Sequence, residues 1–268
     1  MYLNQDQLQH FEDRGFLLLE NALTNQDLAP VIEEYQAYID QRAHQLLSED
    51  KISQLYSDQP FEHRLASICR ENNEIYPELD IMHLRGKASF EFLKNQNLME
   101  IVSSVIGPEI TCSPIQHIRA KLPAGLTPGG SDAHVAPWHQ DAGVTWEEAD
   151  PYFILTVWLP LAEATEENGC LQVIPDIDGK DLLAHYSKAG VGTTIIDEET
   201  PSQPVLTLPM QKGSILLLNK EIPHRSTSKT VRPRDGVPTS DTRKPVHRRA
   251  DPSTQILSPT VSSIRPPF

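Results

Sequence analysis

The chain has 268 residues, a formal net charge of −14 and an isoelectric point near 5.1. An acidic surface of this kind argues against nucleic acid and anionic membranes as partners, because both attract basic proteins. Three widely spaced cysteines show neither a disulfide framework nor zinc-ligand spacing, and no apolar run approaches the length of a signal or membrane-spanning segment. We therefore expect a cytoplasmic protein with one folded domain.

Helices are predicted for most of the first hundred residues. Residues 4–14 form a short amphipathic helix, and a strand-like run follows at 16–19. Thr24 caps the next helix, and Asp27 stands where a carboxylate favours a helix N-terminus. Apolar residues then recur at spacings of three and four, which indicates one buried face. The last of these helices ends at Gly107, which Pro108 follows.

Strand patterns dominate the second half of the chain. The segments rich in aromatic and β-branched residues are 110–122, 152–159, 171–174, 205–208 and 214–219. A shorter helix is expected at 179–187. Helices followed by many short strands predict a mainly β fold, a barrel or jelly roll buttressed by N-terminal helices.

The pair His139 and Asp141 is the first candidate for a functional site. Residues two apart on a strand point to the same face, so the imidazole and the carboxylate can converge. His224, far downstream, is the candidate for a third ligand. Two histidines and one carboxylate with open positions suit a non-haem Fe(II) centre that activates dioxygen. The pair alone is a weak signal, because His-x-Asp occurs by chance on many protein surfaces.

Six segments, two of which contain these three residues, strengthen this interpretation. They are residues 13–21, 138–141, 157–161, 164–175, 212–214 and 224–226, of which 164–175 is the most specific. In this order they resemble the phytanoyl-CoA dioxygenase family of iron- and 2-oxoglutarate-dependent oxygenases, over residues from about 5 to 228. The resemblance implies a double-stranded β-helix, the cupin-like jelly-roll core of these enzymes, with Fe(II), 2-oxoglutarate and O2 as cofactor and cosubstrates.

The resemblance also implies which residues form the site. The expected iron ligands are His139, Asp141 and His224, and the residues expected to line the 2-oxoglutarate pocket are Gln140, Trp158 and Ser226. The far carboxylate of 2-oxoglutarate needs a cation, best supplied by the two-pronged guanidinium of an arginine. In the family this arginine lies about ten residues after the distal histidine. Arg232 and Arg234 are the candidates here, and Arg234 is favoured by its spacing.

Residues 229–268 depart from the family pattern. They hold eight Lys or Arg against three Asp, a net charge of +5, together with seven prolines. The alternating strand expected after the arginine is not found there, since proline cannot pair in a central strand. We predict an oxygenase domain at 1–228 and an atypical, disordered Pro- and Arg-rich tail at 229–268. A missing core strand would leave an unpaired sheet edge.

The predicted function is hydroxylation of a small-molecule or acyl substrate with release of succinate and CO2. Retention of Asp141 argues against halogenation, which needs that coordination position for chloride. Two alternatives remain: a catalytically impaired homologue or binding module that lacks the 2-oxoglutarate-anchoring strand, and a cupin-like metal hydrolase or isomerase. His117 and Lys121 can face the cosubstrate or substrate, and a barrel histidine and a surface lysine are equally compatible with the pattern. The sequence specifies neither the substrate nor the oligomeric state.

Overall fold

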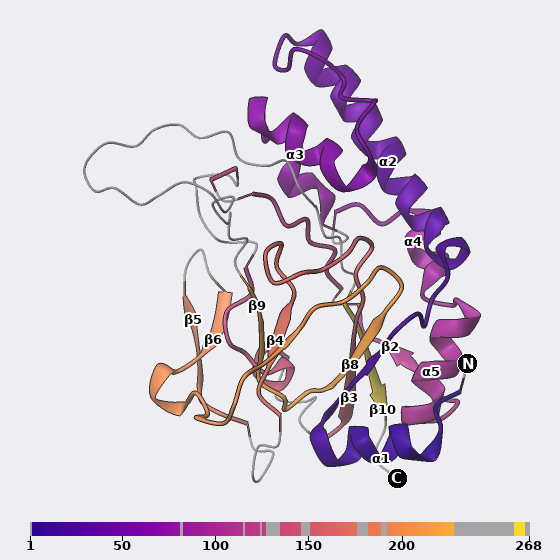
Figure 1. Cartoon of the computed structure of the whole chain (residues 1–268), viewed down its shortest axis with the longest axis vertical. Coiled ribbons are helices and arrows are strands. Elements are labelled where there is room, and N and C mark those ends of the chain that lie inside the picture. Colours follow the sequence, from indigo (N-terminus) through magenta and orange to yellow (C-terminus); the bar gives the residue numbers. More distant parts are fainter. Residues whose placement is uncertain are drawn as a thin grey trace, which may run out of the picture.

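The computed structural model describes residues 2–80, 83–114, 116–123, 125–126, 135–145, 151–175, 182–188, 192–227 and 260–265 (Figure 1). The helices in this part of the chain are α1 (Gln5–Arg14), α2 (Asn25–Ser48), α3 (Phe61–Glu71), α4 (Lys87–Phe92) and α5 (Gln96–Ile106), with the short 3-10 turns η1 (Tyr76–Leu79), η3 (Asp141–Val144) and η5 (Asp197–Glu199). The strands are β1 (Phe16–Leu19), β2 (Thr111–Cys112), β3 (Phe153–Trp158), β4 (Leu171–Val173), β5 (His185–Lys188), β6 (Gly192–Ile195), β7 (Leu206–Leu208), β8 (Ile215–Asn219), β9 (His224–Ser226) and β10 (Thr260–Arg265).

The N-terminal helices begin and end where local sequence signals place them. Asn4 and Thr24 each form a capping box. The side chains of Gln7 and Asp27 accept a hydrogen bond from the backbone N–H of the respective cap residue. Helix α5 stops before Gly107, whose φ of +86° favours glycine. These boundaries confirm the predicted helices. Among the described residues, no helix is both long and apolar enough to cross a bilayer.

A five-stranded antiparallel sheet, in the order β1-β8-β3-β10-β2, forms the centre of the molecule. The N-terminal helices cover one of its faces (Figure 1). Along β8, Ile215 and Leu217 belong to the core shared with the helices, whereas Leu216 and Leu218 belong to a second core on the opposite face. Burial on both faces explains why β8 reads as a continuous apolar run rather than an alternating one.

A second sheet, β7-β4-β9, packs against the free face of the first. Trp158 and Leu216 from the large sheet meet Leu171 and Val173 of β4 in the core between them. Two facing antiparallel sheets with helices outside are the predicted architecture. The cavity described below lies between these two sheets.

Two predicted elements in the middle of the chain are wrong. Among the described residues of 110–122, the structure has strand only at Thr111–Cys112. The helix expected at 179–187 is replaced, where the chain is described, by β5, which pairs with β6 in a two-stranded sheet. Pairing with a neighbouring strand overrides a weak local pattern, because β-structure depends on its context.

The tail also contains a strand where none was expected. Strand β10 lies between β3 and β2, with Ser262 opposite Thr156 and Ser263 opposite Cys112. The prediction of a strandless tail is therefore wrong for these six residues. Their sequence has β-branched residues, and prolines 259 and 266 flank them, so no proline interrupts the ladder. The remainder of 229–268 lies outside the described residues, and the domain boundary at 228 stays a prediction.

Candidate metal centre

Backbone pairing brings the two histidines together. His139 and His224 form an isolated antiparallel bridge, with hydrogen bonds of 3.0 Å from His139 N to His224 O and 2.9 Å in return. Gln140 has extended φ and ψ angles of −108° and 141°, which turn His139 and Asp141 to one side. Asp141 begins the 3-10 turn η3 rather than lying in a strand. The side chains of His139 and Asp141 therefore converge as their spacing predicted, and the single bridge brings His224 beside them.

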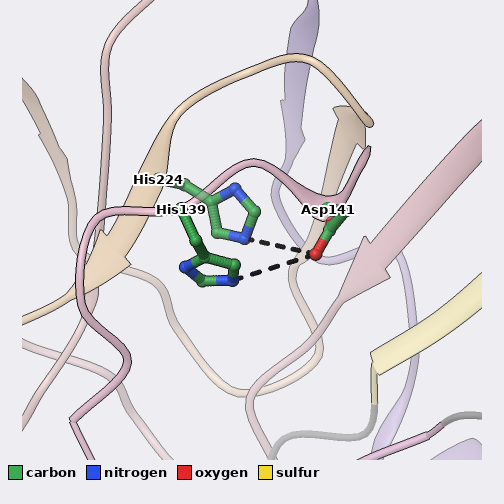
Figure 2. Close-up of side chains that lie close together, drawn as sticks. All are labelled: His139, Asp141 and His224. Carbon is green, nitrogen blue, oxygen red and sulfur yellow. Dashed lines mark ion pairs between the residues drawn. The ribbon is translucent and has the colours of Figure 1, made fainter. Parts of the chain in front are cut away.

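The three side chains converge on one point (Figure 2). Their ligand atoms all lie within 4.8 Å of one another. The Nε2 atoms of His139 and His224 each lie 3.8 Å from Oδ1 of Asp141, and the two ring centroids are 4.2 Å apart. Two imidazole nitrogens and one carboxylate oxygen thus surround a space that a metal ion can occupy.

Each imidazole is held by a backbone carbonyl two residues earlier. Nδ1 of His139 donates to Pro137 O at 2.8 Å, and Nδ1 of His224 donates to Ile222 O at 2.9 Å. These bonds fix the tautomer, so each Nε2 presents a lone pair toward Asp141. Burial, together with the neighbouring His224, lowers the pKa of His139 to about 4. His139 is therefore neutral near pH 7, as a metal ligand must be.

A hydrogen bond also fixes the orientation of the Asp141 carboxylate. Thr156 on β3 donates a hydrogen bond from Oγ1 to Oδ2 of Asp141, which leaves Oδ1 facing the two imidazoles. Thr156 is buried and points toward the cavity, on the same face of β3 as Trp158. A hydrogen-bonded carboxylate is typical of metal centres, where outer partners fix the ligand geometry.

The triad opens into a cavity of about 260 Å³ between the two sheets. Its described lining consists of Ser113, His117, Arg119, Lys121, Ala136, Pro137, His139, Asp141, Val144, Thr145, Thr156, Trp158, Leu171, Gly192, Thr193, Leu218, His224 and Ser226. Three basic residues two apart, His117, Arg119 and Lys121, share one wall, whereas Trp158 and Leu218 form apolar parts of the lining. A mostly apolar pocket with a few convergent polar groups is typical of a small-molecule site.

The structure places Trp158 and Ser226 in this lining. Their predicted contact with 2-oxoglutarate stays a prediction. Gln140 is not part of the described lining, which corrects the prediction that it lines the 2-oxoglutarate pocket. Its side chain is completely buried; Nε2 donates to Glu221 O at 2.7 Å, and Oε1 accepts from Leu183 N at 2.8 Å. The alternation that turns His139 and Asp141 into the cavity turns the residue between them away. Gln140 therefore supports the backbone behind the site.

Several residues in the cavity lining or beside it were missed or undecided in the sequence. Thr156 carries no sequence signal of its own beyond its place on an apolar strand. His185, in a segment predicted to be helical, accepts a hydrogen bond of 3.1 Å at Nε2 from Gln140 N. His117 lies 3.2 Å from a carboxylate oxygen of Asp80. Lys121 is only 5% exposed, so the surface-lysine alternative is wrong.

The two arginines proposed to anchor 2-oxoglutarate are not placed. Arg232 and Arg234 both lie outside the described residues. Their part in the site stays a prediction.

Comparison with known proteins identifies the chain's relatives. The sequence profile of the phytanoyl-CoA dioxygenase family matches residues 11–236. The chain belongs to this family. The phytanoyl-CoA dioxygenase domain-containing protein 1 of Danio rerio is 25% identical over 258 residues, which covers 85% of this chain and 86% of the relative.

Solved structures agree on the fold of this family member. EvdO2 from Micromonospora carbonacea var. aurantiaca, complexed with 2-oxoglutarate, has a TM-score of 0.58 at 15% identity, covering 100% of this chain and 93% of that chain. The epimerase SnoN, in complex with Fe3+, alpha ketoglutarate and nogalamycin RO, has a TM-score of 0.55 at 13% identity, covering 97% and 83%. These similarities confirm the predicted double-stranded β-helix with a cupin-like core.

Proposed function

We propose that the protein is an Fe(II)- and 2-oxoglutarate-dependent dioxygenase that hydroxylates a small molecule. The observation that carries this proposal is the convergence of His139, Asp141 and His224 on one point at the wall of a cavity. Two imidazoles and one carboxylate on one side of an ion leave its other positions free for cosubstrate and O2. Family membership and the ligands of EvdO2 and SnoN support the same chemistry.

The residues present fit such an ion. Both Nδ1 atoms are occupied by carbonyls, both Nε2 atoms point to Asp141, and Thr156 holds the second carboxylate oxygen. When bound, iron with 2-oxoglutarate and O2 supplies the oxidising power, and succinate and CO2 are the expected products. The protein's own contribution is to hold the ligands rigidly, to orient the cosubstrate and to keep the cavity shielded from bulk water.

Trp158 and Ser226 are proposed to bound the 2-oxoglutarate site. Trp158 adds an apolar surface, and the Ser226 side chain points to the same side of β9 as His224, two residues away. The cavity volume of about 260 Å³ is at the small end for ligand pockets, which favours a compact substrate. The net charge of −14 disfavours nucleic acid and anionic membranes as partners.

Among the reactions that enzymes with this fold catalyse, hydroxylation is the one we propose. SnoN is an epimerase, so the fold alone does not select the reaction. Asp141 keeps the carboxylate position that a halogenase would give to chloride. The impaired-homologue alternative rested on a missing core strand, and β10 now occupies a place in the large sheet, which favours an active enzyme. The unpaired cysteines are consistent with the cytoplasmic location we propose.

The test is an anaerobic titration of the purified protein with Fe(II) and then 2-oxoglutarate, followed by visible absorption. We expect a weak charge-transfer band in the wild type and its loss in His139→Ala. His44→Ala, which changes an exposed histidine on α2, is the matched control and should keep the band. After admission of O2, wild-type protein should release succinate. Iron binding without any response to 2-oxoglutarate would favour the metal hydrolase, isomerase or binding-module alternatives.

A further inference from the structure

One wall of the cavity is an extended segment whose side chains alternate between two environments. Its odd-numbered residues, His117, Arg119 and Lys121, line the cavity. Ile118 and Ala120, which lie between them in the chain, are buried in the core shared with the helices. Residues two apart on an extended chain point to the same side and lie about 7 Å from each other. The wall therefore presents a row of basic side chains to the cavity of a strongly acidic protein.

The two ends of this wall border different parts of the cavity. Lys121 donates a hydrogen bond of 2.6 Å from Nζ to Oγ of Ser226, so its end adjoins the region that the proposed function gives to 2-oxoglutarate. His117 stands four residues earlier, about 13 Å away along an extended chain. The His117 end is therefore the part of the wall that is left for the primary substrate.

His117 is oriented by a carboxylate from the helical layer. Its Nδ1 lies 3.2 Å from Oδ2 of Asp80, the residue that ends the 3-10 turn η1. An ionised carboxylate only accepts hydrogen bonds, so Nδ1 of the neutral ring carries the hydrogen and Nε2 keeps a lone pair. Among the described residues, no group bonds to Nε2 of His117. Since His117 lines the cavity, this acceptor is available to a ligand there.

Arg119 supplies a positive charge beside this acceptor. It is exposed at the cavity, and it forms no hydrogen bond or ion pair within the part of the chain that the structure describes. Its charge also acts on the triad: burial and His224 are the larger causes of the low pKa of His139, and Arg119 adds to them. A planar guanidinium in this situation suits two-pronged binding of a carboxylate.

We propose that Arg119 and His117 bind the primary substrate, and that this substrate is a compact carboxylic acid with a second, hydrogen-bond-donating group. Arg119 binds the carboxylate, and Nε2 of His117 accepts a hydrogen bond from a hydroxyl or ammonium group. The distance of about 7 Å between the two positions favours groups at opposite ends of a short chain. This inference rests on the proposed function and names the substrate class within it.

The experiment uses three probes of equal chain length: 5-hydroxypentanoate, pentanoate and 1-pentanol. The purified protein is loaded anaerobically with Fe(II) and 2-oxoglutarate, and each probe is then titrated by calorimetry and by the visible band. We expect wild-type protein to bind the hydroxy acid most tightly. Pentanoate and pentanol should bind more weakly, because each of them lacks one of the two groups that the site recognises.

Two variants separate the roles of the two side chains. Arg119→Gln should weaken the binding of both acids about tenfold and leave pentanol unchanged. His117→Phe should abolish the preference for the hydroxy acid over pentanoate, a loss of about fivefold in affinity. Both variants should bind Fe(II) and 2-oxoglutarate within about threefold of wild type. The matched control is Arg70→Gln, an exposed arginine on α3 outside the described cavity lining, which should bind every probe as wild type does.

Other outcomes overturn the proposal while the proposed function stands. They are a wild type that binds pentanol as tightly as the acids, unchanged affinity for the acids in Arg119→Gln, and an unchanged preference for the hydroxy acid in His117→Phe. If Arg119→Gln instead loses affinity for 2-oxoglutarate, Arg119 serves the cosubstrate and the proposal is also wrong. Should His117→Phe not fold, His117→Val takes its place with the same expectations. Wild-type protein that binds Fe(II) but not 2-oxoglutarate would contradict the proposed function itself.

Discussion

At the scale of single residues, the metal centre depends on which way each side chain points. The sequence put forward His139, Asp141 and His224 from the His-x-Asp spacing and the family motifs, and the structure brings these three side chains together. It misplaced Gln140, although the same alternation argument turns that side chain away from the cavity. The sequence could not decide whether Lys121 faces the cavity or the surface, because its burial depends on contacts with Gly169 and Ser226, which lie far along the chain.

Thr156 offers a test of how the carboxylate is oriented. Its hydroxyl is the donor to Oδ2 of Asp141, and valine has nearly the same volume without that donor. We expect Thr156→Val to weaken Fe(II) binding about 10- to 100-fold, as is typical when the outer partner of a metal ligand is removed. The measurement is an anaerobic Fe(II) titration by calorimetry. Thr207→Val on β7, outside the cavity lining, is the control, and equal affinities in both variants would show that Asp141 needs no such support.

At the scale of elements, helix ends were predicted well and strand pairing was not. The cap of α2 depends on neighbours in sequence: Thr24 is the predicted cap, and together with Asp27 it forms a capping box. Strand β5 depends on its partner β6, with which it forms a two-stranded sheet. Local signals define the helix caps, whereas strands require knowledge of partners that sequence spacing does not supply.

The cap of α2 leads to a prediction about pH. Partial burial acts to raise the pKa of Asp27, but hydrogen bonds from Asn95, Thr24 and Asn97 outweigh it and lower the pKa to about 2, from 3.8. A carboxyl group with a lowered folded-state pKa stabilises the fold above its unfolded pKa. That stabilisation is lost as pH falls through the folded value.

Asp27→Asn should therefore reduce the free energy of unfolding by about 1–2 kcal/mol at pH 7, after allowance for solvent screening of a half-buried group. The difference from wild type should shrink below pH 4 and vanish near pH 2. Urea unfolding at a series of pH values measures it. Glu33→Gln, on the exposed face of α2, controls for the loss of one charge. A difference that is the same at pH 7 and pH 2 would contradict the role of the Asp27 carboxylate.

At the scale of the whole molecule, the sequence predicted the helical and sheet layers but not that a strand from the tail completes the large sheet. The apolar strands and N-terminal helices were sufficient to indicate a buttressed jelly roll, because binary patterning largely determines fold class. The strand in the tail was missed because the composition of 229–268, rich in proline and charge, resembles disorder as a whole. Six residues within it, free of proline, instead form β10 between β3 and β2.

Strand β10 can be tested with a single backbone substitution. Ser263 lies opposite Leu155 of β3 and Cys112 of β2, so both edges of β10 are paired at this position. Proline removes the backbone N–H and cannot fit a central strand, so Ser263→Pro should lower the free energy of unfolding by at least about 2 kcal/mol. Ser263→Ala keeps the N–H and should unfold close to wild type in the same urea titration.

The two variants together separate a structural strand from a disordered tail. If the tail does not pair, the proline and alanine variants will unfold at the same urea concentration as wild type. If β10 is part of the sheet, only the proline variant will be destabilised. Its unpaired β3 edge should also make it prone to aggregation, which light scattering would detect. Since Thr156 and Trp158 belong to β3, loss of its partner should in addition weaken Fe(II) binding, linking the end of the chain to the metal centre.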